Sequence, residues 1–134
     1  MFRILIVEDD TELCQLFSHV LEKNGYHTRM VSNGQEALDA LAEEYVDLII
    51  SDIMMPVMDG LTAAKTIRAA VRADAKTIPI IAMTANAFQE DQEQCYKAGM
   101  NAHLAKPLNM EKVIRTIYEQ CSYKLSGRQQ NKKT

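Results

Sequence analysis

Five short apolar runs alternate with five stretches of helical periodicity, and this alternation restricts the fold more than any other feature. The apolar runs predict strands over residues 2–7, 27–31, 47–51, 78–83 and 102–105. Each run is followed by a helical pattern, which in the first case is formed by Leu13, Leu16, Phe17, Val20 and Leu21. Strands and helices that alternate over short connections form parallel sheets with right-handed crossovers and helices on both faces. We therefore expect an α/β fold with a doubly wound parallel sheet.

Several helix ends carry their own local signals. Asn24-Gly25 should end the first helix, because glycine accepts the left-handed backbone of a C-terminal cap. Asn33 stands three residues before Glu36, the spacing of a capping box, and Asn109 is placed to cap the last helix. We expect one domain over residues 1–124 and a disordered polar, basic tail or linker over residues 125–134.

Composition argues against two classes of partner. The formal net charge is −3, but the last ten residues contain three basic residues and no acid. The rest of the chain therefore has 12 basic and 18 acidic residues, and such an acidic body argues against direct nucleic-acid binding. No apolar run approaches the ~20 residues of a membrane span. We expect a cytoplasmic protein whose domain makes no membrane contact.

The three cysteines, Cys14, Cys95 and Cys121, lie far apart and form no CxxC pair. This spacing predicts neither a zinc site nor a disulfide framework. Each cysteine lies in an expected helix, so we interpret all three as small apolar fillers.

Polar residues that can carry chemistry follow four of the five expected strands. Glu8 and Asp9 follow the first strand, Asp52 the third, Thr84 the fourth and Lys106 the fifth. Since parallel strands end at one edge of the sheet, and ligands bind at that edge in doubly wound folds, these residues should lie together. Each also has a simpler reading, as a helix cap, a turn residue or a solvated lysine. The joint pattern is harder to explain in that way.

The residue types at this edge favour phosphate chemistry with a divalent metal ion. Three neighbouring carboxylates repel one another unless a cation is present. Oxygen ligands without histidine or cysteine indicate a hard cation, which in the cell is Mg²⁺. The ammonium of Lys106 and the hydroxyl of Thr84 can contact phosphoryl oxygens. Asp52 is then the expected nucleophile, because a carboxylate can form an acyl phosphate.

With these residues in order, the chain resembles a response-regulator receiver domain over roughly residues 2–123. The resemblance rests on Ile6-Val7-Glu8-Asp9-Asp10, Asp52-Ile53-Met54-Met55-Pro56, Asp59-Gly60, Thr84-Ala85 and Lys106-Pro107. It implies a flavodoxin-like sheet with strand order 2-1-3-4-5. It also implies a phosphoacceptor module of a two-component system or phosphorelay, in which a histidine kinase or a histidine phosphotransfer protein supplies the phosphoryl group.

The same resemblance implies roles for individual residues. Asp52 accepts the phosphoryl group, and Thr84 and Lys106 hold it. The ligands of Mg²⁺ are Glu8, Asp9, Asp52 and the backbone carbonyl of Met54, whereas Asp10 is not among them. The Lys106–Pro107 peptide bond is cis. The fourth helix, fifth strand and fifth helix form the face that changes on activation, and this face is a candidate for self-association.

Two features distinguish this chain within the resemblance. The family usually has Tyr or Phe three residues before the lysine, where this chain has His103. His103 either acts with Thr84 as the switch or lies at the surface. Met54 and Asn86 flank the expected path of the hydrolytic water, and neither can act as a base, which predicts slow dephosphorylation. The second half of the chain is also similar to receivers of hybrid sensor kinases.

Three alternatives remain weaker. A magnesium-dependent phosphohydrolase with an aspartate nucleophile would need an acid/base Asp at position 54, which is Met. A nucleotide-binding protein would need a glycine-rich phosphate loop after the first strand, and none is present. A receiver-like protein that only mediates contacts would need a damaged acidic site. We therefore expect a phosphoacceptor regulator and not an enzyme, with catalysis limited to its own phosphorylation and slow autodephosphorylation.

Overall fold

A computed structural model describes residues 2–53, 60–70, 77–84, 89–106 and 108–120. Its centre is a sheet of five parallel strands in the order β2-β1-β3-β4-β5. The strands are β1 (Arg3–Val7), β2 (His27–Val31), β3 (Leu48–Asp52), β4 (Ile80–Thr84) and β5 (Ala102–Ala105). The predicted doubly wound fold and its strand order are confirmed.

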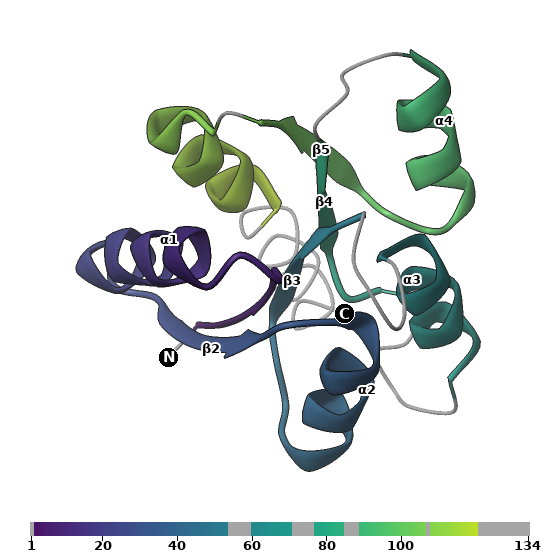
Figure 1. Cartoon of the computed structure of the whole chain (residues 1–134), viewed down its shortest axis with the longest axis horizontal. Helices are drawn as coiled ribbons and strands as arrows, with labels where there is room; N and C mark the ends of the chain where they lie inside the picture. The colour runs from purple at the N-terminus through teal and green to yellow at the C-terminus, as the bar shows by residue number, and fades with distance from the viewer. Residues whose placement is uncertain (1, 54–59, 71–76, 85–88, 107, 121–134) are drawn as a thin grey trace, which may run out of the picture.

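Helices cover both faces of this sheet (Figure 1). They are α1 (Thr11–Lys23), α2 (Gly34–Glu43), α3 (Gly60–Ala69), α4 (Gln89–Lys97) and a final helix over residues 110–120, called the last helix below. In Figure 1, α1 and the last helix lie on one side of the sheet, and α2, α3 and α4 lie on the other.

The alternation of side chains along the strands divides the core into two parts. Ile4 and Ile6 of β1 point toward α1 and the last helix, where they join Phe17, Leu21, Val113 and Ile117. Leu5 and Val7 point the other way, and join residues of α2, α3 and α4 such as Ala40, Ile67 and Cys95. Central strands that are buried on both faces explain why the sequence shows continuous apolar runs instead of alternation.

The predicted caps hold the helix ends. The side chain of Asn33 accepts the N–H of Glu36 at 2.9 Å and starts α2. Asn109 accepts the N–H groups of Glu111 and Lys112 at 3.0 and 3.3 Å and starts the last helix. Gly25 has a φ of 91°, the left-handed conformation expected where α1 ends.

Several expected strand boundaries were wrong by one or two residues: β1 begins at Arg3, β3 ends at Asp52 and β4 ends at Thr84. β3 begins at Leu48 and not at Asp47, whose carboxylate accepts the N–H of Arg3 at 2.8 Å. β4 begins at Ile80, after Pro79, which has no N–H to donate.

Cys14 and Cys95 are buried, in agreement with their predicted role as apolar fillers, and Cys121 lies outside the described residues. Burial, together with the negative charges of Glu8 and Asp10, raises the pKa of the Cys14 thiol to about 11. This thiol therefore stays protonated at neutral pH. Among the described residues, no helix is both long and apolar enough to cross a bilayer. The expected tail over residues 125–134 lies outside them and stays a prediction.

Candidate functional site

The register of the strands brings the candidate residues to one edge of the sheet. Val7 pairs with Ser51, so Glu8 follows β1 beside Asp52, the last residue of β3. Asp52 pairs with Met83, which places Thr84 at the end of β4. Thr84 pairs with Ala105, the last residue of β5, and Lys106 directly follows Ala105 in the chain. The convergence expected from parallel strands is therefore present.

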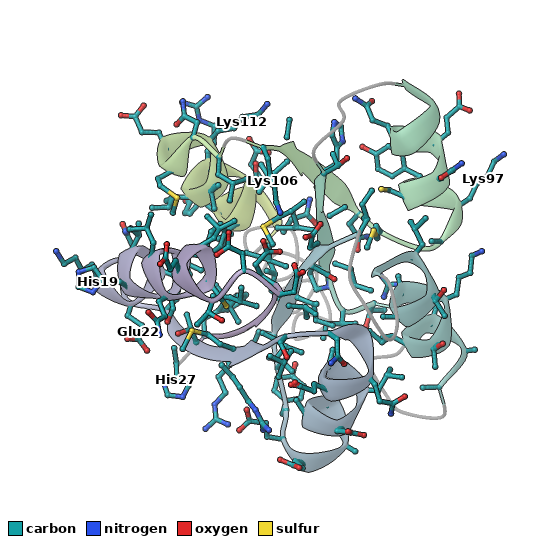
Figure 2. The ribbon with its side chains drawn as sticks, in the orientation of Figure 1. His19, Glu22, His27, Lys97, Lys106 and Lys112 are labelled. Carbon is teal, nitrogen blue, oxygen red and sulfur yellow. The ribbon has the colours of Figure 1, made fainter. Side chains whose placement is uncertain are left out.

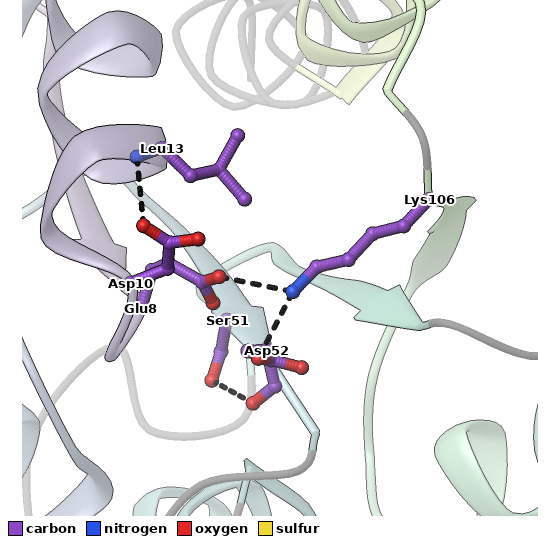
Figure 3. Close-up of polar contacts among 6 residues, drawn as sticks. All are labelled: Glu8, Asp10, Leu13, Ser51, Asp52 and Lys106. Atoms are coloured by element: carbon purple, nitrogen blue, oxygen red, sulfur yellow. Dashed lines mark hydrogen bonds and ion pairs between the residues drawn. The ribbon is translucent and has the colours of Figure 1, made fainter.

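Lys106 joins the two buried carboxylates at this edge (Figure 3). Its Nζ lies 2.9 Å from Glu8 Oε1 and 3.1 Å from Asp52 Oδ2. The two acids are almost fully buried, with 3% of Glu8 and 5% of Asp52 exposed. In Figure 2, Lys97 and Lys112 reach outward, whereas Lys106 lies between β5 and the last helix. The Lys106 ammonium therefore lies against the two buried carboxylates of Glu8 and Asp52.

Asp9 completes a cluster of three acids. One carboxylate oxygen from each of Glu8, Asp9 and Asp52 lies within 4.8 Å of the others, and Asp9 is exposed at the opening. Glu8 Oε2 is fully buried, and no hydrogen-bond partner for it exists within the described part of the chain. A buried acceptor without a donor is costly. Three carboxylates that each offer one oxygen, with no histidine or cysteine in the cluster, fit a hard divalent cation.

The pKa values of Glu8 and Lys106 reflect the burial of these groups and their closeness to Asp52. Burial, followed by the closeness of the Asp52 carboxylate, raises the pKa of Glu8 from 4.5 to about 7, and Lys106 only partly opposes this rise. Burial lowers the pKa of Lys106, but its hydrogen bonds to Glu8 and Asp52 raise it by more. Lys106 therefore remains an ammonium, although one positive charge does not fully compensate two buried acids.

The acid next to this cluster has a different task. The side chain of Asp10 is the N-cap of α1 and accepts the N–H of Leu13 at 3.2 Å (Figure 3). The acid that caps α1 is therefore Asp10, and none of the three acids in the cluster has this role.

Two residues support the backbone of Asp52, and of these Ser51 was not recognised in the sequence. The Ser51 hydroxyl donates to the backbone carbonyl of Asp52 at 2.9 Å. Gly60 begins α3 against the backbone of Asp52, where a Cβ atom would collide with the Asp52 carbonyl oxygen. Gly60 belongs to the motif on which the family resemblance rests, but its close approach to Asp52 was not predicted.

The remaining candidates differ in how the structure places them. Thr84 is buried at the end of β4, and its carbonyl accepts the N–H of Lys106 at 2.8 Å. His103 lies on β5, where its ring contacts Tyr96 of α4. Met54, Asn86 and Pro107 lie outside the described residues, so the predicted carbonyl ligand, the water-path residues and the cis peptide bond stay predictions.

Comparison with known proteins identifies the family. The model of the response regulator receiver domain matches residues 4–118. The chain belongs to this family. Response regulator receivers are signalling modules of two-component systems and not enzymes in the usual sense, so this receiver is a phosphoacceptor regulator. Receivers of this kind interact with histidine kinases or phosphotransfer proteins.

The relatives include stand-alone regulators and parts of kinases. This receiver is 36% identical to the polar-differentiation response regulator DivK of Brucella ovis, over 85% of this chain and 91% of DivK. It is 34% identical to the protein of Oryza sativa subsp. indica named Probable histidine kinase 1, over 83% of this chain but 14% of that protein. The receiver therefore corresponds to nearly all of one relative and to a small part of the other.

Solved structures agree with this assignment. Chemotaxis response regulator CheY4 of Vibrio cholerae has a TM-score of 0.83 and 32% identity, covering 90% of this chain and 98% of its own. The receiver domain of sensor histidine kinase PA1611 from Pseudomonas aeruginosa PAO1 has a TM-score of 0.80 and 36% identity, covering 89% of this chain and 96% of its own. That second structure has a magnesium ion coordinated in its active-site cleft.

Proposed function

We propose that Asp52 is the phosphoacceptor of this receiver. The observation that supports this most strongly is the position of Lys106 Nζ, 3.1 Å from Asp52 Oδ2 at the edge where four strands end. Asp52 also differs from the exposed Asp9 in being buried, which protects an acyl phosphate from bulk water. The carboxylate attacks the phosphorus of a phosphohistidine, the P–N bond breaks, and the imidazole leaves with the electron pair and takes up a proton.

The acidic cluster is the proposed magnesium site. Glu8, Asp9 and Asp52 are its side-chain ligands, and the backbone carbonyl of Met54 is the further ligand implied by the family. Bound Mg²⁺ supplies positive charge for the phosphoryl oxygens. Glu8 Oε2 has no donor among the described residues, and this atom together with the raised pKa of Glu8 supports a cation at this place.

Lys106 and Thr84 are proposed to hold the phosphoryl group. In the described structure Lys106 neutralises Glu8 and Asp52, and the ammonium is close enough to contact an oxygen of a group attached to Asp52. Thr84 is buried at the end of the neighbouring strand, and its hydroxyl is the proposed donor to a second oxygen. Thr84 and His103 then form the proposed switch, because they lie on the adjacent strands β4 and β5.

The proposed donor is a histidine kinase or a histidine phosphotransfer protein, as in two-component systems and phosphorelays. The proposed output surface comprises α4, β5 and the last helix, and self-association through this surface is one possible output. Direct contacts with nucleic acid or a membrane are not part of the proposal, and a cytoplasmic location suits a cytoplasmic kinase domain as donor. Slow autodephosphorylation completes the proposed cycle.

A small phosphodonor provides the simplest test. Wild type, Asp52→Asn and Asp10→Asn are incubated with Mg²⁺ and phosphoramidate, and intact mass is measured. Asp10→Asn is a matched control, since asparagine caps a helix as well as aspartate does. We expect one phosphoryl group on wild type and Asp10→Asn, and none on Asp52→Asn. Equal phosphorylation of Asp52→Asn would contradict the proposal.

A further inference from the structure

Helix α4 is held to the sheet by few buried side chains. Among its described side chains, residues 92–97, Cys95 is the one that is buried, whereas Glu93, Tyr96 and Lys97 are exposed. A short helix with so little apolar burial depends on individual contacts for its position. Two contacts among the described residues lie at α4, one at the C-terminal end of the helix and one at its side.

The first contact is a clamp made by Arg68, a residue of α3, the helix beside α4 in Figure 1. Arg68 donates to the carbonyl oxygen of Gly99 from Nε at 2.9 Å and from Nη2 at 2.7 Å, and its Nη2 also donates to Asn101 Oδ1 at 2.8 Å. Asn101 Oδ1 accepts the N–H of Ile80 as well, at 2.9 Å. The guanidinium thus ties the end of α4 to α3 and to the start of β4, where a cation also suits the helix dipole.

Gly99 makes this clamp possible. Its φ of 101° lies in the left-handed region, and a Cβ atom there would come within 2.7 Å of Arg68 Cγ. The three hydrogen bonds that Arg68 donates to Gly99 and Asn101 therefore hold the C-terminal end of α4 in place.

The second contact is weaker and lies one turn earlier. The rings of Tyr96 and His103 meet edge to face, with centroids 6.2 Å apart and an interplanar angle of 85°. Tyr96 Oη and His103 Nδ1 are 3.4 Å apart, a long hydrogen bond in which the tautomer of His103 decides the donor. Tyr96 is 50% exposed, so this contact can open without uncovering the core.

The register of the sheet places His103 next to Thr84. Ala82 pairs with His103 and Thr84 pairs with Ala105 in parallel strands, so all four point to the same face. Ala82 packs with Cys95 in the core, which shows that this is the face covered by α4. On this face Thr84 lies directly beside the small Ala105 and diagonally beside His103, so a shift of Thr84 toward a phosphoryl group on Asp52 would also change the surroundings of the His103 ring.

From these observations we propose that Tyr96 and His103 form a latch between α4 and β5 that opens on phosphorylation, with the end of α4 clamped by Arg68 as the pivot. The proposal rests on the proposed phosphorylation of Asp52. When His103 moves in response to Thr84, Tyr96 loses its ring and hydrogen-bond partner, and α4 is released on that side while its C-terminal end stays in place. The latch favours the unphosphorylated form. Because coupling is reciprocal, the factor by which the latch favours that form is also the factor by which its removal should strengthen binding of a phosphoryl mimic.

The test measures beryllofluoride affinity, in the presence of Mg²⁺, for wild type, Tyr96→Phe, Tyr96→Ala and Tyr45→Ala. Tyr45 is a matched control, because it is 47% exposed and lies after α2, far along the sheet order from β5. We expect Tyr96→Ala to bind beryllofluoride about three- to tenfold more tightly, and Tyr96→Phe to show a smaller change in the same direction. Tyr45→Ala should equal wild type.

Amide exchange over residues 92–100 provides the second measurement. Without beryllofluoride, Tyr96→Ala should exchange faster there than wild type, and beryllofluoride should speed exchange in wild type. Faster exchange with unchanged affinity in both Tyr96 variants would show a merely structural contact and would overturn the latch. If wild type fails to bind beryllofluoride at all, the phosphoacceptor proposal itself fails, so the two failures can be told apart.

Discussion

Lys106 Nζ lies 3.1 Å from Asp52 Oδ2, although 54 positions separate the two residues and β4 lies between their strands. The same ammonium bridges to Glu8, so without a metal ion it supplies the positive charge at the centre of the acidic edge. We infer that this lysine has two tasks. It stabilises the metal-free fold, and it is in place for a phosphoryl oxygen.

Removal of the Lys106 charge should therefore destabilise the metal-free protein. Lys106→Met leaves Glu8 and Asp52 buried without their shared cation, and the lysine is partly exposed, so we expect a loss of about 1–3 kcal/mol in the free energy of unfolding. Urea denaturation in EDTA and in saturating Mg²⁺ measures this loss. Mg²⁺ should stabilise the variant more than wild type, and equal stability of both proteins in EDTA would argue against the bridging role.

The metal site can be tested by neutralising adjacent acids one at a time. Asp9→Asn should weaken Mg²⁺ binding and slow phosphorylation by phosphoramidate, because it removes one oxygen charge from the cluster. Asp10→Asn keeps the cap of α1 and should change neither property. Calorimetric titration with Mg²⁺ gives the affinities. Undiminished binding by Asp9→Asn, or equal phosphorylation in excess chelator, would exclude this ligand set.

The raised pKa of Glu8 predicts how stability depends on pH in the absence of metal. Below pH 4.5 Glu8 is protonated in both the folded and the unfolded states, whereas between pH 4.5 and about 7 the unfolded state loses this proton first. The free energy of unfolding should therefore fall as pH rises through this window, by at most about 3 kcal/mol relative to Glu8→Gln. Denaturation of both proteins in EDTA at pH 4, 5.5 and 8 checks the sign. Parallel curves would mean that Glu8 has an ordinary pKa.

Slow loss of phosphate is predicted from two residues outside the described structure. Met54 and Asn86 flank the expected path of the attacking water, and neither can remove its proton. Met54→Asn and Asn86→Glu should therefore shorten the lifetime of the phosphoprotein. The decay of the phosphorylated mass is followed after removal of the donor, with Mg²⁺ retained. A wild-type lifetime as short as that of either variant would show that these positions do not control hydrolysis.

The fold was predictable because one pattern determines it. Apolar runs such as residues 47–51 alternate with helical stretches, and this alternation leaves little choice other than parallel strands. The same geometry predicts that Glu8 and Asp52 lie together, since parallel strands end at one edge. Strand boundaries were less predictable, because the contact of Asp47 with Arg3 depends on tertiary structure.

The finer parts of the site could not be predicted from spacing. The pairing of Lys106 with Glu8 joins positions 98 apart and depends on side-chain conformations at the sheet edge. The close approach of Gly60 to Asp52 depends on how α3 enters the fold. The contact of Tyr96 with His103 depends on the packing of α4, whose polar sequence leaves no apolar face to fix its orientation.

The most direct test of the central claim is to locate the phosphoryl group within the chain. Wild type is phosphorylated with phosphoramidate and Mg²⁺, reduced with borohydride, which converts an aspartyl phosphate into homoserine, and then digested for peptide mass spectrometry. We predict homoserine at position 52, and aspartate unchanged at positions 9, 10 and 47. Homoserine at one of these other acids, with Asp52 unmodified, would contradict the proposed phosphoacceptor.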